Sequence, residues 1–577
     1  MPRPPATQFS SLTHLIQQTA EKRHLVASET PLTATVVASF LDRIEFVETI
    51  NAALTWDQSQ WRVSPGNLGK AIVLLPFIHS GSRLPIYSIF EHYQGMDMDL
   101  LFTPEVRPEW LTRDAFSCFL DRLFAAGCEH LFTSLALRVY TAFSIPFHPV
   151  LHGDTTSISL YGAYEGSEDS LPMAPTICLG HSKEKRNDLV QIMLGQVCDP
   201  HGIPLITTIR DGNEADCTWN TAIIQRLAEL DPLSHTDAIY IADAKLATAP
   251  NIRKLLENNF QFVTRCPANF SDKVAARVTR AAYEAGAWIP IGSYQDTDKD
   301  TLETYDVQEF TETTDGGISC RFLVFRGNHR RDEFETDLLK KREELVAVLK
   351  GVTKRRFACE TDAQRALEEA RKILRKHRLW KVELSLETLV TEKNSRGRPG
   401  KNPRPTIQVT EWVIRAGEPQ LQQKVYLTEL RKAESFVLMT NVSQENAPAR
   451  EVLRLYKEQK RVEDNFSVIK RPTMVDTLYL KKPERITALV TLLAVSLLIQ
   501  VVIRVLVRRN LDALPEPPGL DHGCKPLIRP GLKKILRFIE YYSIVTIAGE
   551  RWFRCISPDH EKNLGIWLKL LEFDVGV

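Results

Sequence analysis

The stretch that decides the fold is HPVLHGDTTSISLYG, residues 148–162, in which aliphatic and β-branched residues surround one aspartate, Asp154. Two runs of similar texture follow, APTICLG at 174–180 and LVQIMLGQVCDPHGIPLITTI at 189–209. Short β-branched runs bounded by turn residues predict strands, and the DPHG tetrad at 199–202 predicts a hairpin. This part of the chain should therefore begin with antiparallel strands.

Helix and strand patterns alternate after this hairpin. A helix is expected at about 218–230, a strand at 238–242, a second helix after Pro250 and a further strand at 260–265. Antiparallel strands followed by alternating helices and strands predict an α/β fold built on a mixed sheet.

The length of 577 residues predicts several domains rather than one. Residues 1–143 show mainly helical periodicity and form a predicted N-terminal domain. Residues 144–265 are the first part of the α/β core, and residues 266–449 are interpreted as a β-rich insertion. The core resumes in 450–577 and ends in C-terminal helices.

Composition places the protein among globular, intracellular chains. Hydrophobic residues make up 43% and charged residues 25%, so a large core is expected. The net charge of +1 gives no reason by itself to expect a polyanionic partner. The ten cysteines contain no CxxC pair, and the first residues lack a signal-peptide pattern, which favours a reducing cytoplasm.

One apolar segment, ITALVTLLAVSLLIQVVIRVLV at 486–507, has about the length of a membrane span. Gln500 and Arg504 interrupt it, and nothing else in the chain is membrane-like. We therefore predict a buried core helix and no membrane partner.

Two aspartates lie where a sheet can present them. Asp154 stands inside a Thr-rich strand, to which an acidic residue is poorly suited. Asp243 follows the apolar run 238–242, at the carboxyl end of a strand, where open α/β sheets place ligands. Each alone is more often a strand-end or turn residue, but carboxylates that converge from different elements suit hard divalent cations.

A third carboxylate lies in RLYKEQKRVEDNFSVIKRP, residues 454–472. Tyr456, Gln459, Glu463 and Lys470 are separated by three, four and seven residues, so on one continuous helix they fall within about 60° of each other. Such a face offers a carboxylate flanked by groups that bind phosphate, although a solvated helix with Glu–Lys pairs has the same pattern.

The segment YKEQKRVEDNFSVIK resembles the tyrosine, arginine, glutamate, lysine signature of insertion-sequence transposases in the DDE superfamily. The resemblance extends along the chain, since HGDTTSISLYG and IADAKLAT are similar to the two aspartate sites of these enzymes. Residues 44–73, 180–195 and 481–499 resemble further segments of the large branch that carries a β-rich insertion.

The resemblance implies an RNase H-like catalytic core in which Asp154, Asp243 and Glu463 bind two Mg²⁺ ions, with Mn²⁺ as a substitute. It implies a DNA transposase that cuts transposon ends and joins their 3′-hydroxyls to target DNA by hydrolysis and transesterification. It also implies double-stranded DNA as partner, binding of the DNA ends by the N-terminal domain 1–143, a homodimer on that DNA and a place at the nucleoid of a prokaryotic cell.

The same resemblance assigns phosphate contacts to Tyr456 and Lys470. The arginine of the signature is Gln459 in this chain, which can donate a hydrogen bond to phosphate but supplies no charge. Gln459 is therefore expected to make a weaker DNA contact, or neighbouring Lys460 or Arg461 takes over that contact.

Weaker signals remain outside the triad. The strip around Arg396 and Arg398 (RGRP) resembles a minor-groove hook, although a short basic loop is more often a connector. Trp288 and Trp380 could stack on an unpaired base, but core packing is the commoner use of tryptophan.

The basic turn at 181–186 is as well explained by solvation as by flanking DNA. Asp188 and Asp211 lie near strands but outside any triad motif. Two other functions stay open from the sequence: a decayed DNA-binding copy, and a structure-selective nuclease without strand transfer.

Overall fold

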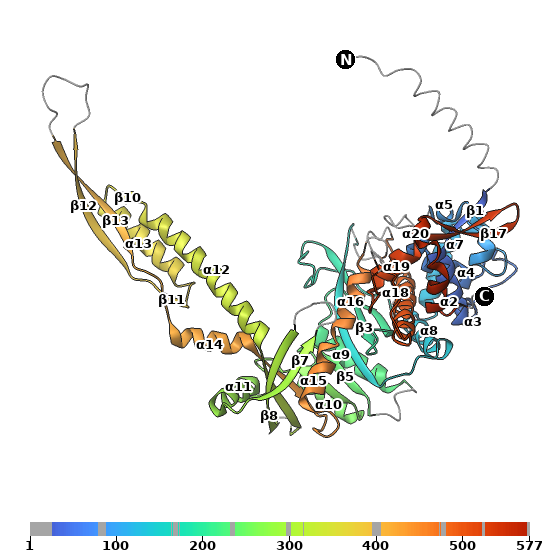
Figure 1. Cartoon of the computed structure of the whole chain (residues 1–577), viewed down its shortest axis with the longest axis horizontal. Coiled ribbons are helices and arrows are strands. Elements are labelled where there is room, and N and C mark those ends of the chain that lie inside the picture. The colour runs from blue at the N-terminus through green and yellow to red at the C-terminus, as the bar shows by residue number, and fades with distance from the viewer. Residues whose placement is uncertain are drawn as a thin grey trace, which may run out of the picture. The chain divides into compact units, whose positions relative to one another are not determined.

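The chain divides into two compact units in this computed structural model (Figure 1). The first unit comprises Met1–Phe262 and Leu455–Val577, and the second comprises Val263–Arg454. The structure describes residues 26–78, 88–162, 164, 171, 173–230, 237–295, 302–314, 317–394, 406–471, 474, 480–521 and 525–573.

The sheet of the first unit begins with the strand that carries Asp154. Its strands are β2 (Val150–Leu160), β3 (Val190–Cys198), β4 (Pro204–Arg210) and β5 (Ile239–Ala242), in the spatial order β4-β3-β2-β5. The pairs β2–β3 and β3–β4 are antiparallel, whereas β2–β5 is parallel. Strand β6 (Gln261–Arg265) then carries the chain into the second unit. This arrangement confirms the predicted α/β fold with a mixed, RNase H-like sheet.

The predicted hairpin at 199–202 is present, and Gly202 N donates to Asp199 O over 2.9 Å. The strand predicted at 174–180 is wrong, because that segment makes only the isolated bridge Cys178↔Gln191. Pro175 has no backbone donor and Gly180 ends the run, so the segment APTICLG offers too few consecutive donors for a ladder.

Two glycines allow helix α9 (Asp216–Ala228) to approach the sheet closely. A Cβ on Gly153 would lie 2.1 Å from the hydroxyl of Tyr240, and a Cβ on Gly195 would lie 2.1 Å from Nε1 of Trp219. Tyr240 uses that space to donate to Asn220 of α9 over 2.8 Å. The depth of α9 on the sheet therefore depends on residues without a side chain.

Helices of the N-terminal segment pack in the first unit around a long apolar helix. They are α2 (Leu32–Arg43), α3 (Phe46–Ala53), α4 (Pro65–Ile78), α5 (Ile89–Tyr93), α6 (Met98–Leu101), η2 (Pro108–Trp110), α7 (Arg113–Ala125) and α8 (Cys128–Ala142). The long helix α18 (Pro483–Asp512) contacts α2, α4, α7 and α8 (Figure 1). Among the described residues it alone is long and apolar enough to cross a membrane, and its apolar window is wholly buried in protein. The prediction of a buried core helix is confirmed.

The C-terminal part of the first unit joins the N-terminal strand in a small antiparallel sheet. Its order is β1-β16-β17, with β1 at Val26–Pro31, β16 at Tyr542–Ile547 and β17 at Glu550–Cys555. Helices α10 (Ala249–Glu257), α19 (Leu532–Ile539), α20 (Pro558–Glu561) and α21 (Leu564–Leu570) complete the unit.

The second unit combines strands with long helices. One set of strands has the order β15-β9-β8-β7, and another has the order β10-β13-β12. The strands are β7 (Ile289–Gln295), β8 (Leu302–Thr313), β9 (Ser319–Gly327), β10 (Arg356–Phe357), β11 (Trp380–Lys381), β12 (Leu384–Asn394), β13 (Thr406–Ala416), β14 (Gln420–Leu421) and β15 (Ser435–Thr440). The helices are α11 (Val274–Ala285), α12 (Asn328–Thr353), α13 (Glu360–Leu374) and α14 (Gln423–Glu434).

The helix predicted over about 450–470 is divided in two, which corrects the sequence analysis. Helix α15 (Ala449–Lys457) ends before α16 (Lys460–Ile469) begins. Between them the amides of Gln459, Arg461 and Val462 donate three residues back, to the carbonyls of residues 456, 458 and 459. Such bonds wind the chain more tightly than an α-helix, so the expected single face is offset at the break.

Candidate active site

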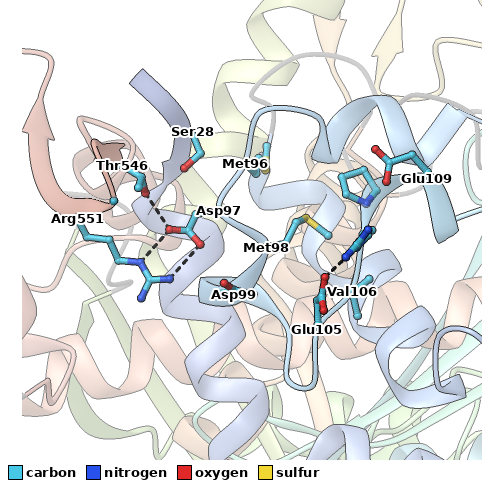
Figure 2. Close-up of a pocket in the computed structure, with 13 residues that line it drawn as sticks. Ser28, Met96, Asp97, Met98, Asp99, Glu105, Val106, Glu109, Thr546 and Arg551 are labelled. Carbon is cyan, nitrogen blue, oxygen red and sulfur yellow. Dashed lines mark hydrogen bonds and ion pairs between the residues drawn. The ribbon is translucent and has the colours of Figure 1, made fainter. Parts of the chain in front are cut away.

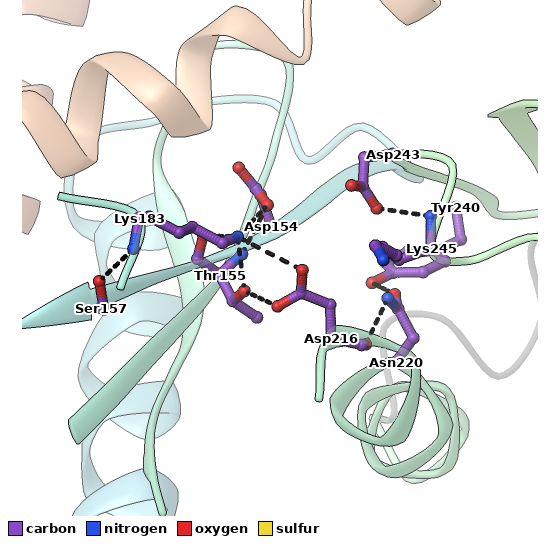
Figure 3. Close-up of polar contacts among 9 residues, drawn as sticks. All are labelled: Asp154, Thr155, Ser157, Lys183, Asp216, Asn220, Tyr240, Asp243 and Lys245. Atoms are coloured by element: carbon purple, nitrogen blue, oxygen red, sulfur yellow. Dashed lines mark hydrogen bonds and ion pairs between the residues drawn. The ribbon is translucent and has the colours of Figure 1, made fainter. Parts of the chain in front are cut away.

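Asp154 lies in the middle of the sheet of the first unit (Figure 3). The amide of Thr155 donates to Asp154 Oδ1 over 2.7 Å. Burial raises the pKa of Asp154 to about 6, and the charge of Asp243 raises it further, while Lys183 opposes the shift. A buried carboxylate with a raised pKa would be stabilised in its charged form by a bound cation.

Asp243 reaches the same place from the next strand. Gly153 and Ala242 are partners in the parallel β2–β5 register, so Asp154 and Asp243 follow side by side. The amide of Lys245 donates to Asp243 Oδ1 over 2.9 Å, and burial raises the pKa of Asp243. The predicted positions of both aspartates, one in a strand and one directly after a strand, agree with the structure.

Asp216 adds a carboxylate that the sequence analysis did not select. It is the first residue of α9, and its Oδ1 accepts a hydrogen bond from Thr155 Oγ1 over 2.5 Å. Its charge raises the pKa values of both Asp154 and Asp243. Figure 3 shows the three aspartates around one space.

Lys183 supplies a cation to this group. Its Nζ donates to Thr155 O over 2.6 Å and to Thr155 Oγ1 over 2.9 Å, and lies 3.6 Å from Asp154 and 3.5 Å from Asp216. The sequence analysis considered this residue only as part of a basic turn. The turn folds back over β2, so only the structure shows that Lys183 lies next to Asp154 and Asp216.

Glu463 is carried by α16, which packs against β2 and β3. It is more exposed than the two aspartates. Burial of part of the side chain and the neighbouring Asp464 raise its pKa, whereas Lys460 and Lys183 lower it. The charge of Lys183 therefore lowers the pKa of each of the three predicted catalytic carboxylates, against the effect of burial.

Lys470 follows α16 and forms an ion pair with Glu184, with Nζ and Oε1 separated by 2.9 Å. Tyr456 is partly buried at the end of α15, and Lys460 and Arg461 are partly buried at the start of α16. Gln459 is only 8% exposed, so it has little surface to offer to a phosphate.

Other predicted contacts lie away from this group or outside the described residues. Arg396 and Arg398 are outside the described residues. In the second unit, the guanidinium of Arg326 lies 4.3 Å from the ring centroid of Trp288, so one face of that ring is already in contact. Trp380 is partly buried in β11.

The two aspartates that the sequence analysis set aside have separate partners. Asp188 forms a two-pronged pair with Arg186, and Asp211 Oδ1 accepts from the amide of Thr176. A better sequence signal for Asp216 was its position at the start of a helix directly after the turn DGNEA, where an acidic residue is favoured.

A pocket of about 820 Å³ lies elsewhere in the first unit and is also acidic (Figure 2). Asp97 on its wall accepts hydrogen bonds from Thr546 and Arg551, and Glu105 pairs with Arg107. The bonds of Asp97 tie β16 and β17 to the N-terminal segment, and the Glu105–Arg107 pair lies within that segment, so both carboxylates have structural partners.

The donor chemistry of the Asp154 group fits a divalent cation. Carboxylate oxygens are the ligands preferred by Mg²⁺, and the raised pKa values of Asp154 and Asp243 show carboxyls that a cation would stabilise in the charged form. Within the described residues, however, no three His, Cys, Asp or Glu side chains already converge closely enough to hold a metal ion. The ammonium of Lys183 provides the positive charge among them.

Comparisons with known proteins give a family for the chain. Residues 33–137 match a domain of unknown function (DUF4277). A solved piggyBac transposase synaptic complex with hairpin DNA has 8% identity and a TM-score of 0.36, covering 89% of this chain and 82% of that chain. Comparison with curated proteins finds no match. Residues 154–499, more than half of the chain, match the transposase DDE domain, so this protein belongs to the DDE transposase family.

Proposed function

We propose that this DDE transposase mobilises an insertion sequence, by cutting the element's ends and joining the freed 3′-hydroxyls to target DNA. The observation that carries the proposal is the pair Asp154, in β2, and Asp243, directly after the parallel strand β5, which lie side by side with raised pKa values. Asp154 also begins the segment that matches the family.

Asp154, Asp243 and Glu463 would hold the divalent cations, two Mg²⁺ ions or Mn²⁺ in their place. Such ions activate a water or 3′-hydroxyl and stabilise the leaving oxygen. The chain itself supplies carboxylate oxygens from β2, from the residue after β5 and from α16. Because one phosphodiester replaces another in the joining step, no external energy is needed.

Phosphate binding is assigned to groups next to Glu463. Lys470 and Tyr456 would contact the transposon end, with Lys460 and Arg461 adding charge beside them. Gln459 lacks charge and is buried, so we leave it out of these contacts. Arg396 and Arg398 are proposed to enter a minor groove, on the strength of their sequence alone. We also propose a homodimer on DNA, at the nucleoid of a prokaryotic cell.

The test uses a supercoiled plasmid that carries the gene with its native flanks. Purified protein is incubated with and without Mg²⁺, beside Asp154→Asn. We expect metal-dependent cleavage at the element's ends that Asp154→Asn abolishes. Binding to the ends without cleavage would favour a decayed DNA-binding copy, and cleavage without joined products would favour a nuclease.

A further inference from the structure

Two adjacent residues, Lys183 and Glu184, engage opposite charges of the candidate active site. Lys183 lies against Thr155, Asp154 and Asp216 at the distances given for the site. Glu184 uses one carboxylate oxygen for Lys470 at 2.9 Å and the other for the hydroxyl of Ser159 at 2.8 Å. The dipeptide thus places a cation at the carboxylates and an anion at the lysine proposed to bind phosphate.

The backbone of this turn is held independently of both side-chain tips. The amide of Lys183 donates to Ser157 Oγ over 3.0 Å, and Ser182 Oγ accepts from the amides of Glu184 and Arg186. Asn187 Oδ1 accepts from the amide of Ser182 over 3.1 Å. The long side chains of Lys183 and Glu184 can therefore change partners while the turn stays attached to β2.

We propose that Lys183 and Glu184 act as internal stand-ins for the metal and for a DNA phosphate, and that both are displaced when the site is loaded. The proposal rests on the proposed function, because it takes Asp154 and its neighbours as the metal site and Lys470 as a phosphate contact. The Lys183 ammonium has a single positive charge where a divalent cation has two. The Glu184 carboxylate presents negatively charged oxygens, as a phosphate does.

Lys183 and Glu184 should weaken metal and DNA binding because their charges compete with those of the metal ion and the phosphate. An ammonium 3.5 to 3.6 Å from two carboxylates partly neutralises them and repels a divalent cation bound to the same oxygens. Likewise, Lys470 must exchange Glu184 for a phosphate before it adds to DNA affinity. Without metal and DNA, the charges of the site are therefore partly neutralised from within the chain. A metal ion must compete with Lys183, and a DNA phosphate must compete with Glu184.

The metal arm measures Mn²⁺ binding to the full-length protein without DNA, by titration calorimetry. Lys183→Met should bind Mn²⁺ at least about tenfold more tightly than the unsubstituted chain. Lys185→Met removes the same charge from the same turn and should bind as the unsubstituted chain does, since in the described structure Lys185 has no ion pair with these carboxylates.

Equal or weaker Mn²⁺ binding by Lys183→Met would overturn the metal part of the proposal and make Lys183 a positioning residue. Lys183→Gln keeps a donor for Thr155 and tests the same charge effect if the methionine variant does not fold, as judged by circular dichroism.

The DNA arm measures fluorescence anisotropy of a labelled duplex that carries the element's end, in EDTA. Glu184→Gln should tighten binding about threefold, the scale of a partly exposed ion pair. The double variant Glu184→Gln/Lys470→Met should bind no better than Lys470→Met alone. A gain that persists in the double variant would show that Glu184 does not act through Lys470.

Asp154→Asn separates this inference from the proposed function. If Asp154→Asn weakens Mn²⁺ binding but Lys183→Met does not strengthen it, only the inference fails. If Asp154→Asn leaves Mn²⁺ binding unchanged, or if no variant binds Mn²⁺, the assignment of the metal site fails as well.

Discussion

The strand-borne aspartates and the helix-borne glutamate of the candidate site are held in different ways. Asp154 lies in β2 and Asp243 directly follows the neighbouring parallel strand β5, and each accepts a hydrogen bond from a backbone amide. Glu463 lies on a short helix that begins after a break, and it is more exposed. The sheet thus positions two of the proposed ligands by register, whereas the position of the third depends on how α16 packs.

Loss of a carboxylate should have the largest effect and tests whether the two regions form one site. Asp243→Asn and Glu463→Gln should each lower end cleavage by about a thousandfold or more while leaving end binding intact. Plasmid cleavage and gel shift measure the two properties. Asp464→Asn, a neighbour on the same helix, is the matched control, and retained cleavage in Glu463→Gln would remove α16 from the site.

The packing of the strand next to Asp154 can be disturbed by a substitution at Gly153. Gly153→Ala forces a Cβ against Tyr240 and disturbs the bond that holds α9, so we expect a loss of about 2–4 kcal/mol in stability. Thermal unfolding followed by circular dichroism measures it. Gly351→Ala in α12 meets nothing within 4 Å and should be neutral or slightly stabilising; equal melting of both variants would contradict the packing argument.

Asp199 tests whether burial alone raises the pKa of an aspartate at the end of a strand, away from the candidate site. It follows β3, and burial raises its pKa to about 7, from an ordinary value of about 4. Because the folded-state pKa is raised, the folded protein retains a proton that the unfolded chain loses. Stability should therefore fall as the pH rises from about 4 to about 7.

Asp199→Asn should remove this pH-dependent loss and melt at a higher temperature than the unsubstituted protein above pH 7. Ile203 N and Tyr140 Oη, the present partners of Asp199, lie at 2.8 and 3.2 Å and can also pair with an amide. The melting temperatures of the two proteins across pH 5–8 provide the measurement. Parallel profiles would show that Asp199 is not the group responsible.

The smallest effect is expected at the helix break. Gln459→Arg restores the charge of the family signature, but the side chain is 8% exposed, so DNA-end affinity should change less than about twofold. Anisotropy with end DNA measures it, and Lys470→Met shows for comparison how far affinity falls when the side chain proposed to bind phosphate is removed. A severalfold gain would show that α15 and α16 rearrange on DNA and expose this position.

Local sequence patterns predicted the strand that carries Asp154 and the strand that ends before Asp243, although they also predicted a strand at 174–180 that is absent. β-branched runs around Asp154, and an apolar run ending at Asp243, predicted a strand and a strand end because side-chain alternation and turn residues act over a few residues. The apolar pattern of α18 likewise predicted burial, which its packing confirms. Periodicity also predicted one continuous helix through Gln459, which is wrong. The chain winds more tightly over only two residues between α15 and α16, and so short a break leaves no mark on the pattern of apolar and polar residues.

The sequence by itself determined the fold class, the family resemblance and the strand positions of Asp154 and Asp243, since each depends on residues close together in the chain. Only the tertiary structure brought Lys183 and Asp216 to Thr155. That meeting requires a turn to fold back over β2 and α9 to lie close above Gly153, and the distances in both cases are set by packing between segments remote in sequence.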